Sequence, residues 1–179
     1  LYIRSGSKIE PLIHGGAQER NIRAGTENVP GIIGFGKAAE LAEKERKKDT
    51  ERMKELQEKL IKGIEDNIDD AMLNGPRDLD ERLPGNVNFA FKYVEGESLI
   101  LMLDRDGVAA STGSACSSES LEPSHVLTSM GLDPKVAHGS LRIGLGRFNT
   151  EEDVNKILEV LPGEIRKLRE MSAVDEKDF

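Results

Sequence analysis

The sequence Leu-Pro-Gly-Asn-Val-Asn-Phe-Ala-Phe at residues 83–91 supplies the strand from which the fold of this 179-residue chain can be assembled. A Pro-Gly turn signal stands at 84–85, and apolar residues then occupy every second position. Alternation with a period of two is typical of a β-strand that buries one face. The segment therefore predicts a strand over residues 86–91.

A long helix is expected on the N-terminal side of this strand. From about residue 37 to residue 69 the sequence reads as one long helix or as a helical hairpin. Its apolar residues recur at helical spacing in a single stripe: Met53, Leu56, Leu60, Ile61, Ile64 and Ile68. The mostly charged run at 43–55 is interpreted as a solvated helix face. Residues 1–35 are expected to form short strands, one of them at 1–4, and glycine-rich turns.

Further helices and strands alternate on the C-terminal side. The expected elements are a short buried helix at 97–104, a strand at 108–111, a helix from 122 to about 130, a strand at 140–146, and a last helix that bends or restarts at Pro162. Thr150 followed by Asp153 resembles a capping box at the start of that last helix. Strands and helices mixed in this order indicate an α+β layered domain.

The composition argues against several classes of function. Charged residues make up 32% of the chain and the formal net charge is −8, which argues against a nucleic-acid-binding groove. No apolar run approaches the roughly 20 residues that a membrane span needs. A single cysteine cannot form an internal disulfide, so a reducing compartment such as the cytoplasm is expected. The histidines, His14, His125 and His138, show no metal-ligand spacing, and no metal site is expected.

The one cysteine, Cys116, stands among small polar residues. It lies in Ser-Thr-Gly-Ser-Ala-Cys-Ser-Ser-Glu-Ser-Leu-Glu-Pro at residues 111–123, a composition that favours turns. A structural cysteine usually sits in an apolar cluster, whereas loops on a rigid scaffold often carry reactive groups. The segment therefore predicts an accessible, reactive thiol on a mobile loop. An inert buried or surface thiol is the alternative.

Two further segments carry candidate binding residues. Arg142 lies between two apolar residues in the strand expected at 140–146. A guanidinium there can bind a carboxylate ligand through two parallel hydrogen bonds, or it can serve an internal ion pair or simply point outward. Residues 15–28 are rich in glycine and in hydrogen-bond donors, and Thr26 can offer its hydroxyl to a phosphate. A plain turn is the alternative for that segment.

Four motifs occur in one order and at fitting separations: Gly25-Thr26-Glu27-Asn28; Val94-Glu95-Gly96-Glu97-Ser98-Leu99; Ser114-Ala115-Cys116-Ser117 with Leu121-Glu122-Pro123-Ser124; and Leu141-Arg142-Ile143-Gly144-Leu145-Gly146-Arg147-Phe148. Together they resemble the C-terminal half of a cysteine desulfurase of the NifS/IscS type, within the class V aminotransferases. The resemblance covers almost the whole chain. The long segment around Cys116 is similar to that of the branch serving iron–sulfur cluster assembly.

The resemblance implies a fold and its division into domains. The fold would be α+β, the C-terminal small domain of a fold type I transferase dependent on pyridoxal phosphate (PLP), with the last strand of the large domain at the start. Residues 1–35 would be the end of the large PLP-binding domain and an interdomain segment. Residues 36–171 would be the C-terminal domain, with its long N-terminal helix and the cysteine loop, and residues 172–179 a polar tail.

The resemblance also implies a reaction and a role for each candidate residue. Cys116 would attack the sulfur of an L-cysteine held as a PLP adduct, leaving alanine, and would carry the sulfur as a persulfide. Arg142 would bind the carboxylate of the substrate, and Thr26 would reach the PLP phosphate of the partner subunit in a cytoplasmic homodimer. The sulfur would pass to an iron–sulfur scaffold or another acceptor protein, and a relay to tRNA thiolation is the one link to nucleic acid.

Some family features are absent from this sequence. Ala17 and Asn21 stand where family members often carry glycine, which puts the local loop geometry in question. The lysine that forms the Schiff base with PLP lies before the first strand in the family, and Lys8 does not match it. The chain therefore reads as a piece of a longer protein that is inactive alone. A non-catalytic sulfur carrier or scaffold-docking module is the alternative function, and a fold with an inert Cys116 is a third possibility.

Overall fold

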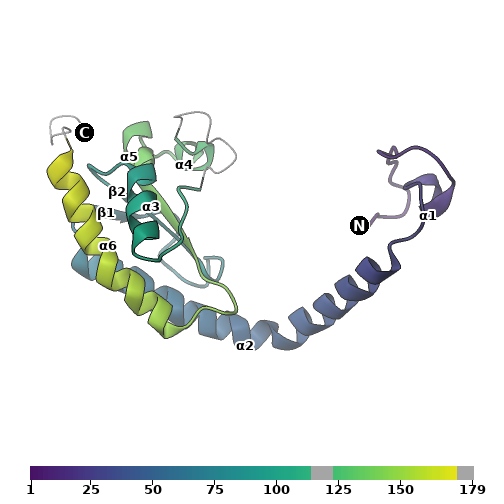
Figure 1. The fold of residues 1–179 in the computed structure, drawn as a ribbon, viewed down its shortest axis with the longest axis horizontal. Helices are drawn as coiled ribbons and strands as arrows, with labels where there is room; N and C mark the ends of the chain where they lie inside the picture. The colour runs from purple at the N-terminus through teal and green to yellow at the C-terminus, as the bar shows by residue number, and fades with distance from the viewer. Residues whose placement is uncertain (114–122, 173–179) are drawn as a thin grey trace. The chain divides into compact units, whose positions relative to one another are not determined.

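The computed structural model describes residues 1–113 and 123–172. The chain forms two compact units, Leu1–Arg46 and Lys47–Phe179. The boundary between them falls within one helix, α2, which runs from Val29 to Asn67 (Figure 1). The expected long helix is therefore a single helix rather than a hairpin.

Helix α2 begins eight residues or so before the expected position because its start is marked by a cap rather than by an apolar stripe. The side chain of Asn28 accepts a hydrogen bond from the backbone N–H of Gly31 at 3.1 Å, as an N-cap residue does. Pro30 follows at the beginning of the helix, where its missing N–H is not needed. The predicted stripe is confirmed, since Leu60, Ile61 and Ile64 are fully buried.

A three-stranded antiparallel sheet forms the centre of the second unit. Its strands are β1 (Ala71–Leu73), β2 (Asn86–Phe91) and β3 (Ser140–Gly144), in the order β1-β2-β3. The expected strand at 86–91 is confirmed, and the strand expected at 140–146 is present but ends at Gly144. The three-residue β1 was not expected. The register places Leu73 opposite Phe89, and Phe89 opposite Leu141.

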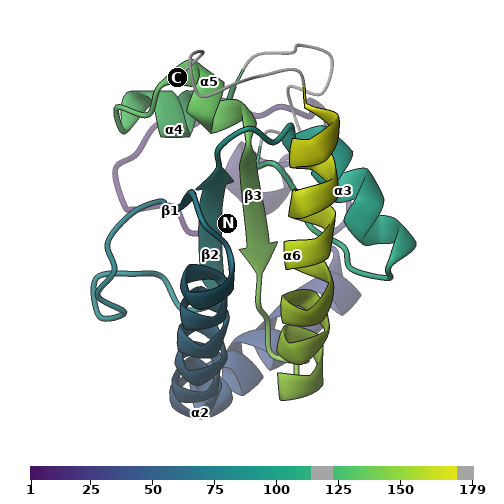
Figure 2. The ribbon, with the colours of Figure 1, turned by 90° about the vertical axis from the view of Figure 1, so that its left-hand side faces the viewer.

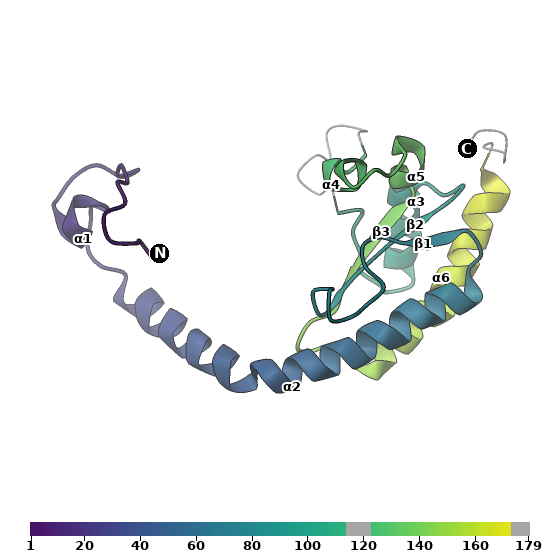
Figure 3. The same ribbon diagram turned by 180° about the vertical axis from the view of Figure 1, so that it is seen from behind.

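Helices cover one face of this sheet. Figures 2 and 3 show α6 (Glu151–Met171) beside the C-terminal part of α2, with the sheet against both. Helix α3 (Gly96–Arg105) contacts both α6 and β3. The core joins buried residues of these elements, among them Leu60, Val87, Phe89, Leu99, Leu103, Leu141, Ile143, Val154 and Leu161. Side chains alternate between the two faces along a strand. The residues next to Val87 and Phe89 on β2, and next to Leu141 on β3, therefore lie on the opposite face of the sheet.

The motif at 94–99 contains the N-cap and the first turn of α3. The Glu95 carboxylate accepts hydrogen bonds from the backbone N–H groups of Glu97 and Ser98, at 2.9 and 2.6 Å. Burial acts to raise the pKa of Glu95, but these hydrogen bonds outweigh it and the net pKa is lowered. The next residue, Gly96, has no room for a side chain, because a Cβ there would lie 2.8 Å from the carbonyl oxygen of Ser140.

The last helix, α6, begins with a capping box and continues through a proline. Thr150 and Asp153 form the expected capping box, in which Asp153 accepts from the Thr150 backbone N–H at 2.9 Å. The expected restart at Pro162 was wrong, since α6 is one continuous helix through this residue, while the expected bend stays a prediction. Buried residues on both sides of Pro162 hold the two halves of the helix against the core: Val154, Ile157, Leu161 and Ile165.

Three other expected elements differ from the structure. Residues 1–4 form no strand, because they have no ladder partner within the described part of the chain. The strand expected at 108–111 is reduced to one bridge between Ser111 and Arg142. Helix α4 covers His125–Ser129, and a second short helix, α5 (Pro134–His138), begins with Asp133 capping the N–H of Lys135. The α+β class itself is confirmed.

Candidate functional site

A row of polar residues crosses the sheet on the face opposite to the one that packs against α2, α3 and α6. Asn74 directly follows β1, and its backbone N–H donates to the carbonyl of Asn88 at 2.9 Å. Asn88 on β2 is opposite Arg142 on β3. Arg142 in turn pairs with Ser111, each donating its backbone N–H to the other's carbonyl, at 2.5 and 3.2 Å. Residues directly opposite one another in a sheet share a face, so the row is continuous.

Arg142 is exposed, while its neighbours Leu141 and Ile143 are buried. The strand alternation therefore places it outward, on the polar face. Among the described residues, no carboxylate forms an ion pair with its guanidinium. The internal ion pair considered from the sequence is not found among the described residues, and the carboxylate-binding role of Arg142 stays a prediction.

A cavity of about 380 Å³ lies over this row. Its walls include Arg142, Asn88, Asn74 and Arg82, and also Gly113 and Ser124. Gly113 and Ser124 lie on either side of the segment 114–122. This segment, which includes Cys116, is outside the described residues. The described ends of the Cys116 segment thus open onto the cavity that contains Arg142, while the accessibility and mobility expected of Cys116 stay predictions.

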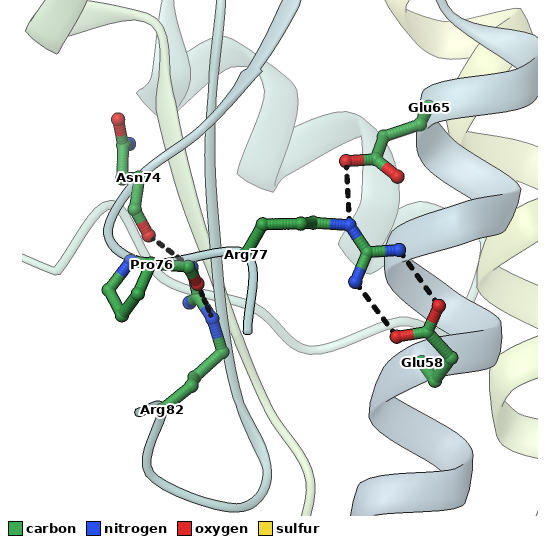
Figure 4. Close-up of polar contacts among 6 residues, drawn as sticks. All are labelled: Glu58, Glu65, Asn74, Pro76, Arg77 and Arg82. Carbon is green, nitrogen blue, oxygen red and sulfur yellow. Dashed lines mark hydrogen bonds and ion pairs between the residues drawn. The ribbon is translucent and has the colours of Figure 1, made fainter. Parts of the chain in front are cut away.

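Buried polar side chains fix the loop that leads from β1 to β2. Arg82 is only 8% exposed, and it donates to the carbonyls of Asn74 and Pro76 at 2.6 and 2.8 Å (Figure 4). It also donates to the carbonyl of Asn86 at 3.2 Å. Burial lowers the pKa of the Arg82 guanidinium. Gln57 on α2 is fully buried and also donates to the Asn86 carbonyl, at 2.9 Å. The Asn86 carbonyl thus accepts hydrogen bonds from both Arg82 and Gln57, and Arg82 also holds the cavity wall at Asn74.

The same loop is tied to α2 by a second arginine. Arg77 forms two parallel hydrogen bonds of 2.8 Å to Glu58 and an ion pair of 3.2 Å to Glu65, as Figure 4 shows. The hydrogen bond with Arg77 holds the pKa of Glu58 below its ordinary value, and the bond with Glu58 raises the pKa of Arg77. Paired fork geometry of this kind is the strong form of an ion pair.

Thr26 belongs to the first unit. Its side chain is exposed. The turn before it is arranged by Arg23, whose guanidinium donates to the carbonyls of Gly25 and Thr26 at 3.1 and 2.5 Å, and by Gln18, which accepts from the Gly25 N–H at 3.1 Å. Gly25 has a φ of +94°, a conformation that favours glycine. The turn thus holds Thr26 at an exposed position.

The two departures from glycine in this segment are explained by the backbone. Asn21 has a φ of +65°, in the left-handed region, where asparagine is among the residues most easily tolerated after glycine. Ala17 has a φ of −86°, which any residue adopts. Both substitutions are therefore compatible with the turn.

Sequence reasoning missed Asn74, Asn88, Gln57 and Arg82. Gln57 had a readable signal, because it falls within the apolar stripe of α2 next to Leu56. Asn88 alternates with buried residues of β2, which placed it on the other face but gave it no role. Arg82 had no local signal, since its burial depends on carbonyls that only the folded loop brings together. Within the described residues there is no cluster of three His, Cys, Asp or Glu that could hold a metal ion, and none of the helices is both long and apolar enough to cross a bilayer.

Comparison with known proteins places these features in a family. Residues 1–157 match the model of the aminotransferase class-V family. The chain belongs to the aminotransferase class-V family. Among curated proteins, it is 59% identical over 172 residues to a cysteine desulfurase IscS of Dictyoglomus turgidum, covering 96% of this chain and 43% of that protein. It is 55% identical over 179 residues to a cysteine desulfurase IscS of Methanosarcina thermophila, covering all of this chain and 44% of that protein. The resemblance predicted from the motifs is confirmed.

Solved structures of class-V relatives have the same fold. A NifS-like protein superposes with a TM-score of 0.72 at 36% identity, covering 95% of this chain and 40% of its own. A NifS-like protein from Rickettsia africae superposes with a TM-score of 0.75 at 31% identity, covering 90% of this chain and 41% of its own. The chain thus spans less than half the length of the relatives it matches.

Proposed function

We propose that this chain is the C-terminal part of a cysteine desulfurase, which removes sulfur from L-cysteine and leaves alanine. One observation supports this most directly. Arg142, a guanidinium without an acidic partner among the described residues, lines the same cavity as Gly113 and Ser124, which flank the segment carrying Cys116. A carboxylate-binding group beside a thiol-bearing segment is what an amino-acid thiol substrate requires.

The roles of the residues in the reaction follow from their chemistry. Arg142 binds the substrate carboxylate through two parallel charge-assisted hydrogen bonds. The Cys116 thiolate attacks the sulfur of the bound cysteine, because the thiolate is the nucleophilic form. A sulfur–sulfur bond forms and the carbon–sulfur bond breaks. The electron pair stays with the carbon, which takes a proton and becomes the methyl group of alanine, so no external oxidant or reductant is needed.

Only part of PLP fits the residues of this chain. The exposed Thr26 hydroxyl, on a turn fixed by Arg23 and Gln18, suits one oxygen of a phosphate. The cavity beside Arg142 has no lysine among its described lining residues, so this chain offers no Schiff-base group there. In the complete protein, PLP would supply the electron sink for the reaction.

The proposal extends to partners. The complete protein acts as a homodimer in the cytoplasm, with Thr26 reaching the cofactor of the partner subunit. The persulfide sulfur passes to an iron–sulfur scaffold or to another acceptor protein, including one that serves tRNA thiolation. The names of the relatives, cysteine desulfurase IscS, support this assignment.

The test is product formation by the complete protein with PLP. L-cysteine in the presence of a reducing thiol is expected to give alanine and sulfide in equal amounts. D-cysteine, with its carboxylate placed differently, is expected to give far less. Alanine formation without sulfide release, or no alanine at all, would contradict the proposal.

A further inference from the structure

The polar row holds a second group suited to the substrate carboxylate. We propose that Asn88 binds this carboxylate together with Arg142, and that Asn74 positions Asn88 for the task. The inference rests on the proposed function, because it concerns the ligand of Arg142.

Asn88 stands at the right place for this role. It is directly opposite Arg142 in the register of β2 and β3, and opposite residues in an antiparallel pair have Cβ atoms about 4.5–5.5 Å apart. Both residues line the cavity of about 380 Å³. A carboxylate that lies along the Arg142 side chain is therefore within reach of the Asn88 amide.

The orientation of the Asn88 amide is fixed by Asn74. The Asn74 Nδ2 group donates to Asn88 Oδ1 at 2.6 Å. Since the oxygen of Asn88 is engaged in this way, its Nδ2 group is the end left for the cavity, and it has no hydrogen-bond partner among the described residues. An amide N–H₂ is a donor, which is what a carboxylate accepts.

Asn74 itself is built into the wall rather than placed on the surface. The residue is 6% exposed, and its backbone carbonyl accepts a hydrogen bond from Arg82 at 2.6 Å (Figure 4). Its backbone N–H donates to the Asn88 carbonyl at 2.9 Å. Its Oδ1 atom is buried and has no partner in the described chain. Because the Asn74 side chain is enclosed in this way, its amide is held in place beside Asn88.

The charge of the cavity favours an anion. Its described lining includes two guanidiniums, Arg82 and Arg142, and a single carboxylate, Glu81. Arg82 is bonded to carbonyl oxygens only among the described residues, so its charge is not cancelled by an ion pair. A positive cavity with an oriented amide donor beside Arg142 discriminates in favour of a ligand carboxylate.

The experiment compares variants of the complete protein with PLP. Asn88→Leu is expected to raise the KM for L-cysteine about 10- to 100-fold, the loss of one hydrogen bond to a charged group, with little change in kcat. Asn88→Asp keeps the shape of the side chain but places a negative charge beside the substrate carboxylate. This repulsion is expected to raise the KM further. The matched control is Asn67→Leu on α2, an exposed asparagine that is not among the described lining residues of the cavity; its KM is expected to stay near that of the unchanged protein.

Asn74→Ala distinguishes positioning from a structural role. It is expected to raise the KM by about 3- to 10-fold alone, and to add nothing in a protein that already carries Asn88→Leu, because the two residues act as a unit. Full additivity would overturn the positioning role. A KM for Asn88→Leu equal to that of the unchanged protein, while Arg142→Ala raises it, would overturn the role of Asn88.

A binding measurement separates this inference from the proposed function. The ligand is 3-mercaptopropionate, which has the carboxylate and thiol of cysteine without the amine. If the complete protein makes no alanine from L-cysteine, the proposed function fails. The carboxylate site is still supported if the unchanged protein binds 3-mercaptopropionate and Asn88→Leu weakens that binding about tenfold or more. Absent binding, or equal binding by both proteins, overturns it.

Discussion

The two units of the chain differ in how they bury apolar side chains. In the second unit, Phe89 and Leu141 are at most marginally exposed and belong to one core. In Leu1–Arg46, all of which the structure describes, Ala24 is the only buried apolar residue, while Leu12 and Phe35 are 95% and 75% exposed. The second unit is thus stabilised by its own residues, and the first is not.

This difference bears on the two candidate sites. The row that contains Arg142 is set by sheet register and by a loop with buried hydrogen bonds, so its geometry is intrinsic to the second unit. The turn at Thr26 is set only by local bonds from Arg23 and Gln18. Exposed apolar side chains gathered on one segment mark an interaction surface, and we expect Thr26 to act only when that surface is covered in the complete protein.

The largest expected effect is a difference in free energy of unfolding between a substitution in the second unit and one in the first. Phe89→Ala in the 179-residue chain is expected to lower the free energy of unfolding by about 3–5 kcal/mol, because it leaves a cavity in the core. Phe35→Ala, the same substitution at an exposed site, is expected to change it by less than about 0.5 kcal/mol. Urea denaturation followed by circular dichroism measures both. Equal losses would mean that the first unit also has a core of its own.

Arg142→Ala in the complete protein tests the site of the second unit. Losing a bidentate contact to the substrate carboxylate is expected to cost about 2–4 kcal/mol, or roughly 30- to several hundred-fold in the KM for L-cysteine. Steady-state kinetics give the value. Unchanged KM and kcat would show that Arg142 is structural.

Thr26 tests the dependence of the first unit on a partner. Thr26→Ala is expected to weaken cofactor binding about tenfold, through the loss of one hydrogen bond to a charged phosphate. Mixing this variant with a subunit that lacks the PLP lysine creates one active site with an intact Thr26 and an intact lysine. Activity is expected to return in the mixed dimers, and its absence after verified subunit exchange would argue against the cross-subunit role.

The smallest effects come from ion pairs at the surface. Arg77→Ala, which breaks the pair with Glu58, is expected to lower the free energy of unfolding by about 1 kcal/mol or less, since both side chains are partly exposed. Arg46→Ala, which breaks a single contact to Glu43 near the end of the first unit, is expected to have a smaller effect. Thermal unfolding at neutral pH compares the two variants.

The effect of Arg77 has a defined pH dependence. Because Arg77 lowers the pKa of folded Glu58, the stabilisation is present above the pKa of the unfolded glutamate and is lost as the pH falls through the folded value. The difference between the unchanged protein and Arg77→Ala is therefore expected to shrink in acid. A difference that grows as the pH falls would contradict the cause assigned to this pKa.

Regular patterns in the sequence predicted the elements of the core. The stripe of α2 and the alternation of β2 each follow from one buried face, and the Thr150–Asp153 pair is a local hydrogen-bonding signal. Such elements are encoded within a few turns or residues, so the sequence alone specified them. The NifS/IscS resemblance then identified Cys116, Arg142 and Thr26 as candidate residues.

Features that depend on distant contacts could not be read in this way. Strand β1 is three residues long, too short for any period to appear. Pro162 argued for a break, but packing of Leu161 and Ile165 on the core kept α6 continuous. Arg82 and the Asn74–Asn88 pair gain their roles only when the loop between β1 and β2 folds onto the sheet, which no local pattern encodes.

The central claim is that Cys116 receives sulfur from a cysteine bound by Arg142. The most direct test is mass spectrometry of the Cys116 peptide after the complete protein has reacted with L-cysteine in the absence of an acceptor. The account predicts a gain of one sulfur atom on Cys116, with one alanine formed per site, and neither product in Cys116→Ser, which keeps its bound PLP. Alanine formed at the normal rate by Cys116→Ser, or no added sulfur on Cys116 in an active protein, would contradict it.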